Sequence, residues 1–321
     1  MKEKLLIWFD EHGRELPWRG TENPYLIWIS EVIFQQTTIK QGTDYYLRFV
    51  ERFPTVEALA DASEDEVLRL WQGLGYYSRA RNLHAAARQI VEKGEFPSNY
   101  REIRALKGVG DYTAAAICSI AYNQPYAVVD GNVYRVLSRC FASEMPIDTP
   151  EGKRFFADLA QKQLDKRRPG LYNQAIMDFG ALHCTPKSPH CEDCPLSAEC
   201  RAYAVGRQAD FPVKARKTKV EEVKLTYLLT HDDEAVYLRK RPANGIWAGL
   251  YEAPTGQGKG QPFFTTTHVL THRRIHCEAY DVKVANNKEI KGFQRVKWCD
   301  LHKFALSRLM EMIIEKFRKN E

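Results

Sequence analysis

The stretch LKGVGDYTAAAICSIAY, Leu106–Tyr122, decides the fold of the first half of the chain. A short helical pattern leads into Gly108 and Gly110, and a second helical pattern follows directly. Two glycines permit a tight turn, and the free amides at the start of the second helix point outward. Because such amides bind phosphate oxygens, the stretch predicts a helix-hairpin-helix that holds a nucleic-acid backbone without reading its sequence. A plain connection between two helices is the alternative, and the small residues Ala114–Ala116, which permit close packing, favour phosphate binding.

Residues 1 to about 205 carry the signals of a series of helices. SEDEVLRLWQG contains a capping box, Ser63 with Glu66, and DTPEGKRFFADLAQKQL begins with Thr149 before a first-turn proline. No convincing alternation of apolar and polar residues occurs here. We therefore predict a mainly α-helical domain over residues 1–205.

The character of the sequence changes near residue 205. Residues 206–222 are polar, lack helical periodicity and predict a basic linker. Its cations include Lys214, Arg216, Lys217 and Lys219. Beyond it, VKLTYLLTH and AVYLRKR alternate on either side of DDE, which predicts a β-hairpin. HVLTHRRIHCEAYDVKV predicts a further strand or pair, and DLHKFALSRLMEMIIEKFRK predicts a closing amphipathic helix, so residues 223–321 should form an α+β domain.

Composition limits the class of protein. The chain has 321 residues, 44% of them apolar, which is enough for about two folded domains. Its net charge of +6 is compatible with an anionic partner but does not establish one. The N-terminal MKEKLLIWFDEHG has too short an apolar run for a signal peptide, and no run approaches the roughly 18 residues of a membrane span. We expect an intracellular protein without a membrane partner.

Four cysteines gather in CTPKSPHCEDCPLSAEC with the spacing C-x6-C-x2-C-x5-C. They are Cys184, Cys191, Cys194 and Cys200. Disulfides need an oxidising compartment, so inside a cell the cluster favours a metal site. Four thiolates suit tetrahedral zinc or a [4Fe–4S] cluster by ligand type, and the spacing favours iron–sulfur only modestly. We interpret the four scattered cysteines as ordinary buried residues; they are Cys118, Cys140, Cys277 and Cys299.

Glu31 is the only charged residue between positions 22 and 40. Its apolar neighbours on a helical pattern would remove water from the carboxyl and raise its pKa, as a general acid near neutral pH requires. A solvated helical glutamate explains this stretch alone equally well. The following Gln35–Thr37 offer groups that could hydrogen-bond base edges.

Asp130 stands directly before the helical stretch GNVYRVLSR. The positive end of the helix dipole would keep its carboxylate ionised. A simple N-cap explains Asp130 alone better than catalysis does. Asp130 becomes a candidate catalytic residue because it follows the predicted DNA-binding hairpin by about twenty residues.

Together these features resemble the helix-hairpin-helix DNA glycosylases of the endonuclease-III-like superfamily, and within it the adenine DNA glycosylases of the MutY type. The resemblance covers essentially the whole chain, and its motifs are highly specific in combination. They are LPWRG, SEVIFQQT, GLGYYSRARNL, GVGDYTA, VDGNVYRVLSR and the four-cysteine loop. The resemblance implies a [4Fe–4S] cluster on the loop, with a structural, DNA-facing role, and a MutT-like C-terminal domain.

The resemblance also implies a reaction: excision, in base excision repair, of adenine mispaired with 8-oxoguanine or guanine in double-stranded DNA. The adenine must be flipped out of the duplex. Glu31 would protonate adenine N7 and help to activate water, and Asp130 would stabilise the cationic sugar. Further implied site residues are Tyr112 and Asn132 in the active site, Trp18, Arg19 and Gln174 around adenine, Gln36, Thr37 and Tyr76 at the wedge beside 8-oxoguanine, and Gly108 and Gly110 on the DNA backbone.

Two positions refine this expectation. Relatives that also cut the strand carry a lysine nucleophile where this chain has Tyr112, and a phenol cannot form an imine, so we expect a monofunctional glycosylase. NGIWAGLYEAPTG matches the MutT-like fold, but the glutamate-rich Nudix box is absent, which predicts a reader of 8-oxoguanine without a divalent metal. The recognition loop has Leu270, Thr271 and His272 where the family commonly has Phe-Ser-His, and Phe34 replaces a usual leucine.

Two other functions are compatible with parts of this pattern. A bifunctional endonuclease-III-like glycosylase/AP lyase needs a lysine in place of Tyr112 and no second domain. A non-catalytic iron–sulfur DNA-binding module needs an inert residue in place of Glu31 or Asp130. The sequence meets neither requirement. We predict a monomer in the bacterial cytoplasm, associated with the nucleoid.

Overall fold

The computed structural model describes residues 1–215 and 220–320, which group into two compact units. One unit combines Met1–Glu57 with Ala85–Lys217, and the other combines Ala58–His84 with Thr218–Glu321. A helical segment of the first half thus belongs to the same unit as the C-terminal sheet. The domain boundaries 1–205, 206–222 and 223–321 stay a prediction. Three of the linker cations, Arg216, Lys217 and Lys219, lie outside the described residues.

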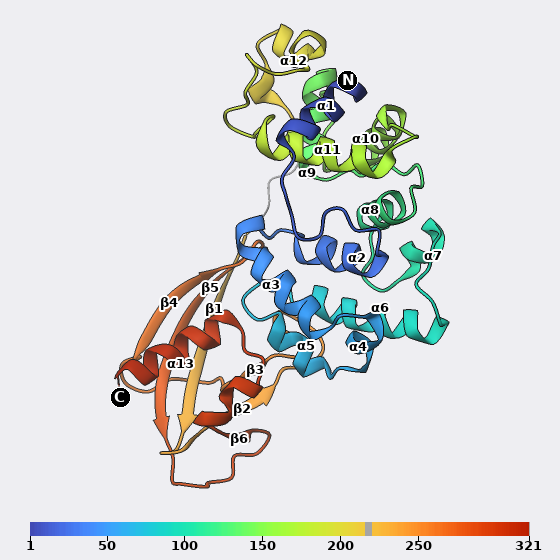
Figure 1. Ribbon diagram of the computed structural model, residues 1–321. Helices are drawn as coiled ribbons and strands as arrows, with labels where there is room; N and C mark the ends of the chain where they lie inside the picture. Colours follow the sequence, from blue (N-terminus) through green and yellow to red (C-terminus); the bar gives the residue numbers. More distant parts are fainter. Residues whose placement is uncertain (216–219, 321) are drawn as a thin grey trace. The chain divides into compact units, whose positions relative to one another are not determined.

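The first 215 residues are helical, as the sequence predicts (Figure 1). The longer helices are α1 (Lys2–His12), α2 (Pro24–Ile33), α3 (Ile39–Arg52), α6 (Ser78–Lys93), α8 (Asp111–Ala121), α9 (Gly131–Phe141), α10 (Pro150–Gln163) and α11 (Pro169–Leu182). The shorter ones are α4 (Val56–Asp61), α5 (Glu64–Leu70), α7 (Tyr100–Ala105), α12 (Arg201–Ala204) and the 3-10 turns η1 (Ser197–Glu199) and η2 (Gln208–Asp210).

The predicted helix starts carry side-chain caps. Ser63 Oγ accepts a hydrogen bond from the Glu66 amide at 3.2 Å, and Thr149 Oγ1 accepts one from the Gly152 amide at 3.0 Å. Such caps satisfy amides that the helix itself leaves unpaired. Both start signals are therefore confirmed.

The core of the first unit fixes the helices that carry the candidate site. Helix α11 contacts α1, α8 and α9, and its Phe179 is buried together with Trp8 of α1 and Phe156 of α10. Each large apolar side chain contributes about 1.5–3 kcal/mol by leaving water. The helix α9, which begins directly after Asp130, is therefore held by this buried core.

The second unit contains a mixed sheet of order β3-β2-β1-β5-β4, with β6 beside β2 (Figure 1). The strands are β1 (Glu221–His231), β2 (Ala235–Lys240), β3 (Tyr251–Glu252), β4 (Phe264–Val269), β5 (Arg273–Lys283) and β6 (Gln294–Lys297). β1 and β2 are antiparallel across residues 232–234, which confirms the predicted hairpin. β1 runs parallel to β5, while the other pairings are antiparallel. The predicted α+β class is confirmed.

The closing helix differs from its prediction. The sequence predicts a helix from Asp300, but the structure has a 3-10 turn η3 (Trp298–Lys303) and then α13 (Arg308–Asn320). The chain is extended in between because the Tyr251 amide donates to the Ala305 carbonyl at 2.8 Å and Tyr251 forms a bridge with Leu306. Pairing with a strand thus overrides helix propensity at these residues.

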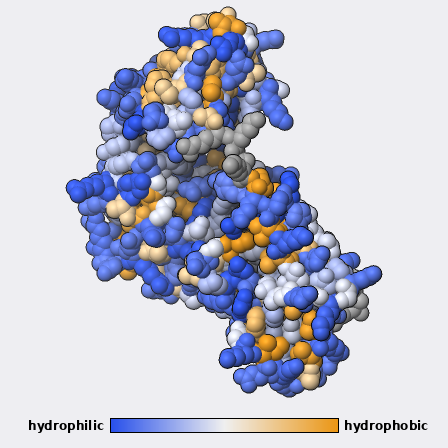
Figure 2. All heavy atoms as spheres, turned by 180° about the vertical axis from the view of Figure 1, so that it is seen from behind, coloured by the Kyte–Doolittle hydropathy of each residue, from blue (hydrophilic) through white to orange (hydrophobic). Residues whose placement is uncertain are grey.

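The surface carries no large apolar band on the face seen in Figure 2, where apolar patches are separated by hydrophilic residues. Among the residues that the structure describes, no helix is long and apolar enough to cross a membrane.

Candidate active site

One pocket of about 820 Å³ in the first unit gathers most of the predicted catalytic residues. Glu31 comes from α2, Tyr112 from the first turn of α8, and Asp130 from the residue before α9. Gln36 and the hairpin glycines also line the pocket. Segments about a hundred residues apart in the sequence therefore meet at a single hollow.

Glu31 is held in an apolar setting, as predicted. Trp28 and Val32 on the same helix are buried. Burial raises the Glu31 pKa to about 7; the hydrogen bond from Tyr112 opposes this, and the nearby Asp130 carboxylate adds to it. A carboxyl with such a pKa holds a proton and can release it near neutral pH.

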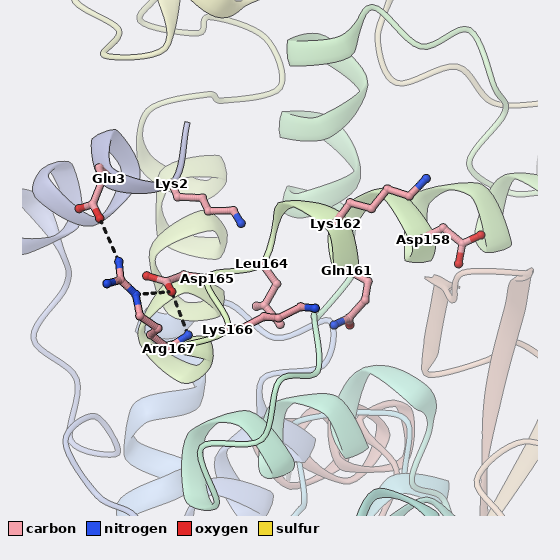
Figure 3. A pocket seen from close by; sticks show the side chains of 9 residues that line it. All are labelled: Lys2, Glu3, Asp158, Gln161, Lys162, Leu164, Asp165, Lys166 and Arg167. Carbon is pink, nitrogen blue, oxygen red and sulfur yellow. Dashed lines mark hydrogen bonds and ion pairs between the residues drawn. The ribbon is translucent and has the colours of Figure 1, made fainter.

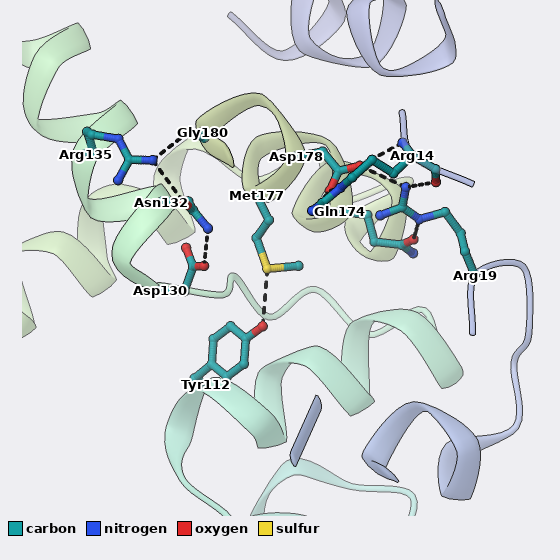
Figure 4. A network of polar contacts seen from close by, with 10 residues as sticks. All are labelled: Arg14, Arg19, Tyr112, Asp130, Asn132, Arg135, Gln174, Met177, Asp178 and Gly180. Atoms are coloured by element: carbon teal, nitrogen blue, oxygen red, sulfur yellow. Dashed lines mark hydrogen bonds and ion pairs between the residues drawn. The ribbon is translucent and has the colours of Figure 1, made fainter. Parts of the chain in front are cut away.

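Asp130 caps α9 and is oriented by a chain of hydrogen bonds (Figure 4). Its Oδ1 accepts from the Val133 amide at 2.7 Å, and its Oδ2 accepts from Asn132 Nδ2 at 2.8 Å. Arg135 in turn donates to Asn132 Oδ1 at 2.8 Å and to the Gly180 carbonyl. Burial raises the pKa of Asp130, and the donors from Val133 and Asn132 counteract it. The N-cap prediction is correct, and the structure adds that desolvation works against the dipole.

Tyr112 stays a protonated phenol in this pocket. Its pKa is raised well above the ordinary value by burial, by the charges of Glu31 and Asp130, and by its hydrogen bond to Glu31. The hydroxyl also donates to Met177 Sδ at 3.3 Å (Figure 4). Tyr112 is thus a hydrogen-bond donor. Among the described lining residues, the only primary amine is that of Lys153.

The hairpin between α7 and α8 has the predicted form. Gly108 has φ +75°, in the left-handed region that favours glycine. Gly110 precedes α8, and a side chain there would meet no heavy atom within 4 Å. The amides at the start of α8 therefore face open space where a phosphate can approach.

A buried carboxylate that sequence reasoning missed organises Arg19 and Gln174. Asp178 Oδ2 accepts from Arg19 Nη1 at 2.9 Å, and Arg19 Nε donates to Gln174 Oε1 at 3.0 Å (Figure 4). Arg14 Nε donates to the other Asp178 oxygen at 3.1 Å. Burial favours a raised Asp178 pKa, but the hydrogen bonds from both arginines hold it below its ordinary value. The missed signal is a lone carboxyl in the apolar stretch PGLYNQAIMDFGAL of α11, the same signal that revealed Glu31.

Trp18 and Gln36 sit at the edge of the same region. The Trp18 ring stacks on the Phe34 ring with their centroids 4.2 Å apart, and Phe34 lines the pocket. Gln36 has φ +58°, a left-handed conformation that is uncommon for residues other than glycine. Thr37 Oγ1 lies 3.5 Å from the Gln35 carbonyl, so its hydroxyl faces its own backbone.

A second hollow of about 830 Å³ adjoins the pocket and shares Gln161 with it (Figure 3). The Gln161 side chain is held in place, because its Oε1 accepts from the Ala127 amide at 3.0 Å and its Nε2 donates to the Pro125 carbonyl at 2.7 Å. Arg167 there lies near Glu3, at 3.8 Å. The buried acid of this hollow, Asp165, accepts hydrogen bonds from the Arg167 amide at 2.9 Å and from Arg168 Nε at 3.2 Å, and these lower its pKa. Among the described residues that line it, the hollow therefore lacks a carboxyl with a raised pKa like that of Glu31.

The remaining predicted residues lie in the second unit. Thr271 and His272 form the turn between β4 and β5, and the Thr271 hydroxyl contacts the Tyr76 hydroxyl. Beside the turn, Arg273 donates to Glu221 at 2.8 Å and Arg274 pairs with Glu222 at 2.7 Å. The turn is therefore less cationic than its sequence indicates.

The four clustered cysteines surround one cavity. Cys184 follows α11, with its amide bound to the Phe179 carbonyl at 2.8 Å, and Cys200 precedes α12. Arg139 Nη1 donates to Cys184 Sγ at 3.3 Å and to the Thr185 carbonyl at 2.7 Å. Cys140 lines the same cavity and Cys299 is exposed, so interpreting these two as ordinary buried residues was wrong.

The four thiols fit an iron–sulfur cluster by donor type and by the cavity that they share. Thiolates are the usual ligands of a [4Fe–4S] cluster, in which each cysteine binds a different iron, and they also suit tetrahedral zinc. Within the described residues, no group of three or more His, Cys, Asp or Glu is arranged to hold one metal ion. The donor from Arg139 would tune such a cluster electrostatically.

Comparisons with known proteins agree with this geometry. Residues 29–161 match the family described as HhH-GPD superfamily base excision DNA repair protein, and residues 225–316 match a NUDIX domain. An adenine DNA glycosylase of Buchnera aphidicola is 36% identical over 262 residues, which cover 78% of this chain and 72% of that protein. An adenine DNA glycosylase of Rattus norvegicus is 32% identical and covers 99% of this chain and 78% of its own length.

Solved structures share the helical fold. A thermostable thymine-DNA glycosylase aligns with a TM-score of 0.59 and 29% identity, covering 63% of this chain and 94% of its own. An endonuclease III in a non-covalent DNA complex aligns with a TM-score of 0.54 and 25% identity. The alignment covers 64% of this chain and 94% of that one.

Proposed function

Because the chain belongs to the adenine DNA glycosylase family, and so excises adenine in base excision repair, we propose that its substrate is adenine opposite 8-oxoguanine or guanine in double-stranded DNA. The observation that carries this proposal is the pocket in which a carboxyl of pKa about 7, Glu31, faces Asp130 and Tyr112.

Glu31 is the general acid of this proposal. Its proton goes to adenine N7, the bond from N9 to the sugar C1′ breaks, and adenine leaves with the electron pair. The sugar becomes cationic, and the Asp130 carboxylate, held by Val133 and Asn132, stabilises it. Glu31, now ionised, accepts a proton from the water that adds to C1′, which restores the acid and leaves an abasic site.

The other site residues bind and orient the DNA. The amides after Gly108 and Gly110 hold a phosphate, as the open space beside Gly110 allows. Arg19, fixed between Gln174 and Asp178, contacts the extruded adenine with its remaining donors. We assign Trp18 to the adenine pocket, Gln36, Thr37 and Tyr76 to the wedge and Thr271 with His272 to 8-oxoguanine.

We assign a [4Fe–4S] cluster to Cys184, Cys191, Cys194 and Cys200, which surround one cavity. When bound, the cluster supplies structural order to the loop between α11 and α12 and takes no part in adenine release. Arg139 ties this loop to α9, whose first turn orients Asp130.

The phenol of Tyr112 supports a monofunctional reaction that leaves the strand uncut. We further propose a monomer that works on DNA in the bacterial cytoplasm, with the nucleoid.

A single-turnover assay tests the substrate. Duplexes containing adenine opposite 8-oxoguanine, guanine or thymine are incubated with excess enzyme and then treated with alkali to reveal abasic sites. We expect release in the first two and none in the third. Equal release from all three duplexes would contradict the proposal.

A further inference from the structure

The turn that carries Tyr76 has an unusual backbone. Gly73 has φ +96° and Gly75 has φ +74°, and Tyr76 itself has φ +47°. Glycine adopts such angles readily, but a tyrosine stays there only when its surroundings impose the conformation. The Tyr76 side chain is 45% exposed, so its own packing does not impose it. The restraint must come from neighbouring residues.

Part of the restraint lies within the segment Ala58–His84. Trp71 Nε1 donates to the Gly75 carbonyl at 3.1 Å. Arg79 donates to the same carbonyl at 3.3 Å, and its guanidinium lies over the rings of Trp71 and Tyr76. Trp71 and Arg79, which lie on either side of the turn Gly73–Tyr76 in the sequence, thus restrain it.

The rest comes from residues more than two hundred positions later in the chain. The buried Tyr77 hydroxyl accepts from the Gly73 amide at 3.3 Å and donates to the Leu306 carbonyl at 3.2 Å. Gln72 Oε1 accepts from the Leu306 amide at 3.1 Å, and Gln72 Nε2 donates to Glu311 Oε1 on α13. The backbone amide and carbonyl of Leu306 are thus bound by Gln72 and Tyr77, the residues on either side of the turn Gly73–Tyr76.

Further contacts fix the same helical segment to the sheet. Lys240 pairs with Asp65 at 2.5 Å, and the Tyr251 hydroxyl donates to the other Asp65 oxygen at 3.3 Å. Arg81 donates to the Ala248 carbonyl. The turn is therefore clamped on several sides within one compact unit.

We infer that Gln72 is a positioning residue for mispair recognition: through Leu306 and Glu311, the C-terminal part of the chain holds the turn Gly73–Tyr76 so that Tyr76 is set to enter the duplex. The C-terminal domain then contributes to discrimination mechanically, in addition to any base contact made by Thr271. This inference rests on the proposed function, which makes Tyr76 the wedge.

A charge swap tests the clamp. Gln72→Glu keeps an acceptor for the Leu306 amide but sets a carboxylate against Glu311. Adding Glu311→Gln restores an amide–carboxylate pair with the partners exchanged. Losing a hydrogen bond to a charged group costs enough for roughly a tenfold change or more. We expect Gln72→Glu to lower the rate preference for adenine opposite 8-oxoguanine over adenine opposite guanine about tenfold, and the double variant to restore it.

The wedge is read directly by fluorescence. A 2-aminopurine placed beside 8-oxoguanine brightens when an inserted side chain unstacks it, and Glu31→Gln keeps the adenine in place during the measurement. Gln72→Glu should reduce the brightening, and Gln124→Ala should not. Gln124 is a matched control, because it also bridges to a carbonyl, that of Ser98 at 2.8 Å, but in the other unit.

A double-mutant comparison separates positioning from general stability. In a Tyr76→Ala chain, Gln72→Glu should change the preference by less than about twofold, since there is no wedge left to position. An undiminished effect in that chain, or an unchanged fluorescence signal and preference in Gln72→Glu alone, would overturn the inference. A wild-type chain that releases adenine opposite thymine as fast as adenine opposite 8-oxoguanine or guanine would instead overturn the proposed function.

Discussion

Replacing Glu31 with glutamine should make the protein more stable and inactive at the same time. The pocket holds the Glu31 pKa near 7, whereas the unfolded chain ionises it near its ordinary value of 4.5. At neutral pH the unfolded chain carries Glu31 ionised, and folding disfavours this ionised form. Glutamine has almost the same shape and no charge, so Glu31→Gln removes this cost together with the catalytic proton.

The size of the effect follows from the pKa. Moving a carboxyl from 4.5 to about 7 lowers the free energy of unfolding by about 3 kcal/mol once the pH exceeds both values. Below pH 4.5 the group is protonated in both states and nothing is lost. Between these limits, the free energy of unfolding of the wild-type chain falls by about 1.4 kcal/mol per pH unit relative to that of the variant. At pH 8 the variant should unfold roughly 6–12 °C higher.

Thermal unfolding of wild type and Glu31→Gln at pH 4.5, 6 and 8, followed by near-ultraviolet circular dichroism, measures this difference. Single-turnover assays at pH 7 should show a loss of about 10²–10⁴-fold or more in adenine release, and duplex binding should persist. Asp178→Asn is the matched control with the opposite sign: its pKa is held low by arginines, so it should destabilise the chain at pH 8.

A Glu31→Gln stabilisation that is the same at pH 4.5 and pH 8 would refute the pKa argument. Adenine release within about tenfold of wild type, well short of the usual loss, would place the acid elsewhere.

Borohydride should trap no covalent enzyme–DNA adduct in useful yield; if it does, Lys153→Ala should abolish the adduct, as the amine lines the pocket. The purified protein should be brown and contain iron and sulfide in equal amounts, and Cys200→Ser should lose both colour and iron; an active, colourless zinc protein would contradict this. Thr271→Ala with His272→Ala should shrink the preference for 8-oxoguanine over guanine opposite adenine, by about 1–3 kcal/mol for each lost base contact. Arg273→Ala should weaken binding to both duplexes alike and flatten its salt dependence by less than one full phosphate contact, because the arginine is already paired with a glutamate; a selective loss on one duplex would show base reading instead.

Local patterns in the sequence predicted much of the site. A lone carboxyl among apolar residues revealed Glu31, and a residue before a helix start revealed Asp130, because burial and capping depend on near neighbours. Asp178 carries the same signal as Glu31 but was missed. Its role depends on Arg14 and Arg19, which lie on a loop more than 150 positions away, and no periodicity encodes that meeting.

Contacts between distant segments could not be predicted. The hydroxyl contact between Tyr76 and Thr271 joins residues 195 positions apart. The late start of α13 has the same origin, because Leu306 pairs with Tyr251 and is thereby drawn out of the helix its sequence favours. Tertiary pairing outweighs helix propensities of less than about 1 kcal/mol per residue.

The division of the second unit between Ala58–His84 and the C-terminal residues has a consequence for how the protein is made. A ribosome adds roughly 5–20 residues per second, so Gln72 and Tyr77 emerge many seconds before Leu306 exists. During that time the turn at Gly73 lacks its outer brace, and a nascent chain is open to chaperones there. A chain stopped after residue 217 would keep that state permanently. If the C-terminal residues formed a separate module, their loss would leave the rest of the chain intact. Because Ala58–His84 packs with them, truncated forms should have a lower yield and solubility than such a loss would cause.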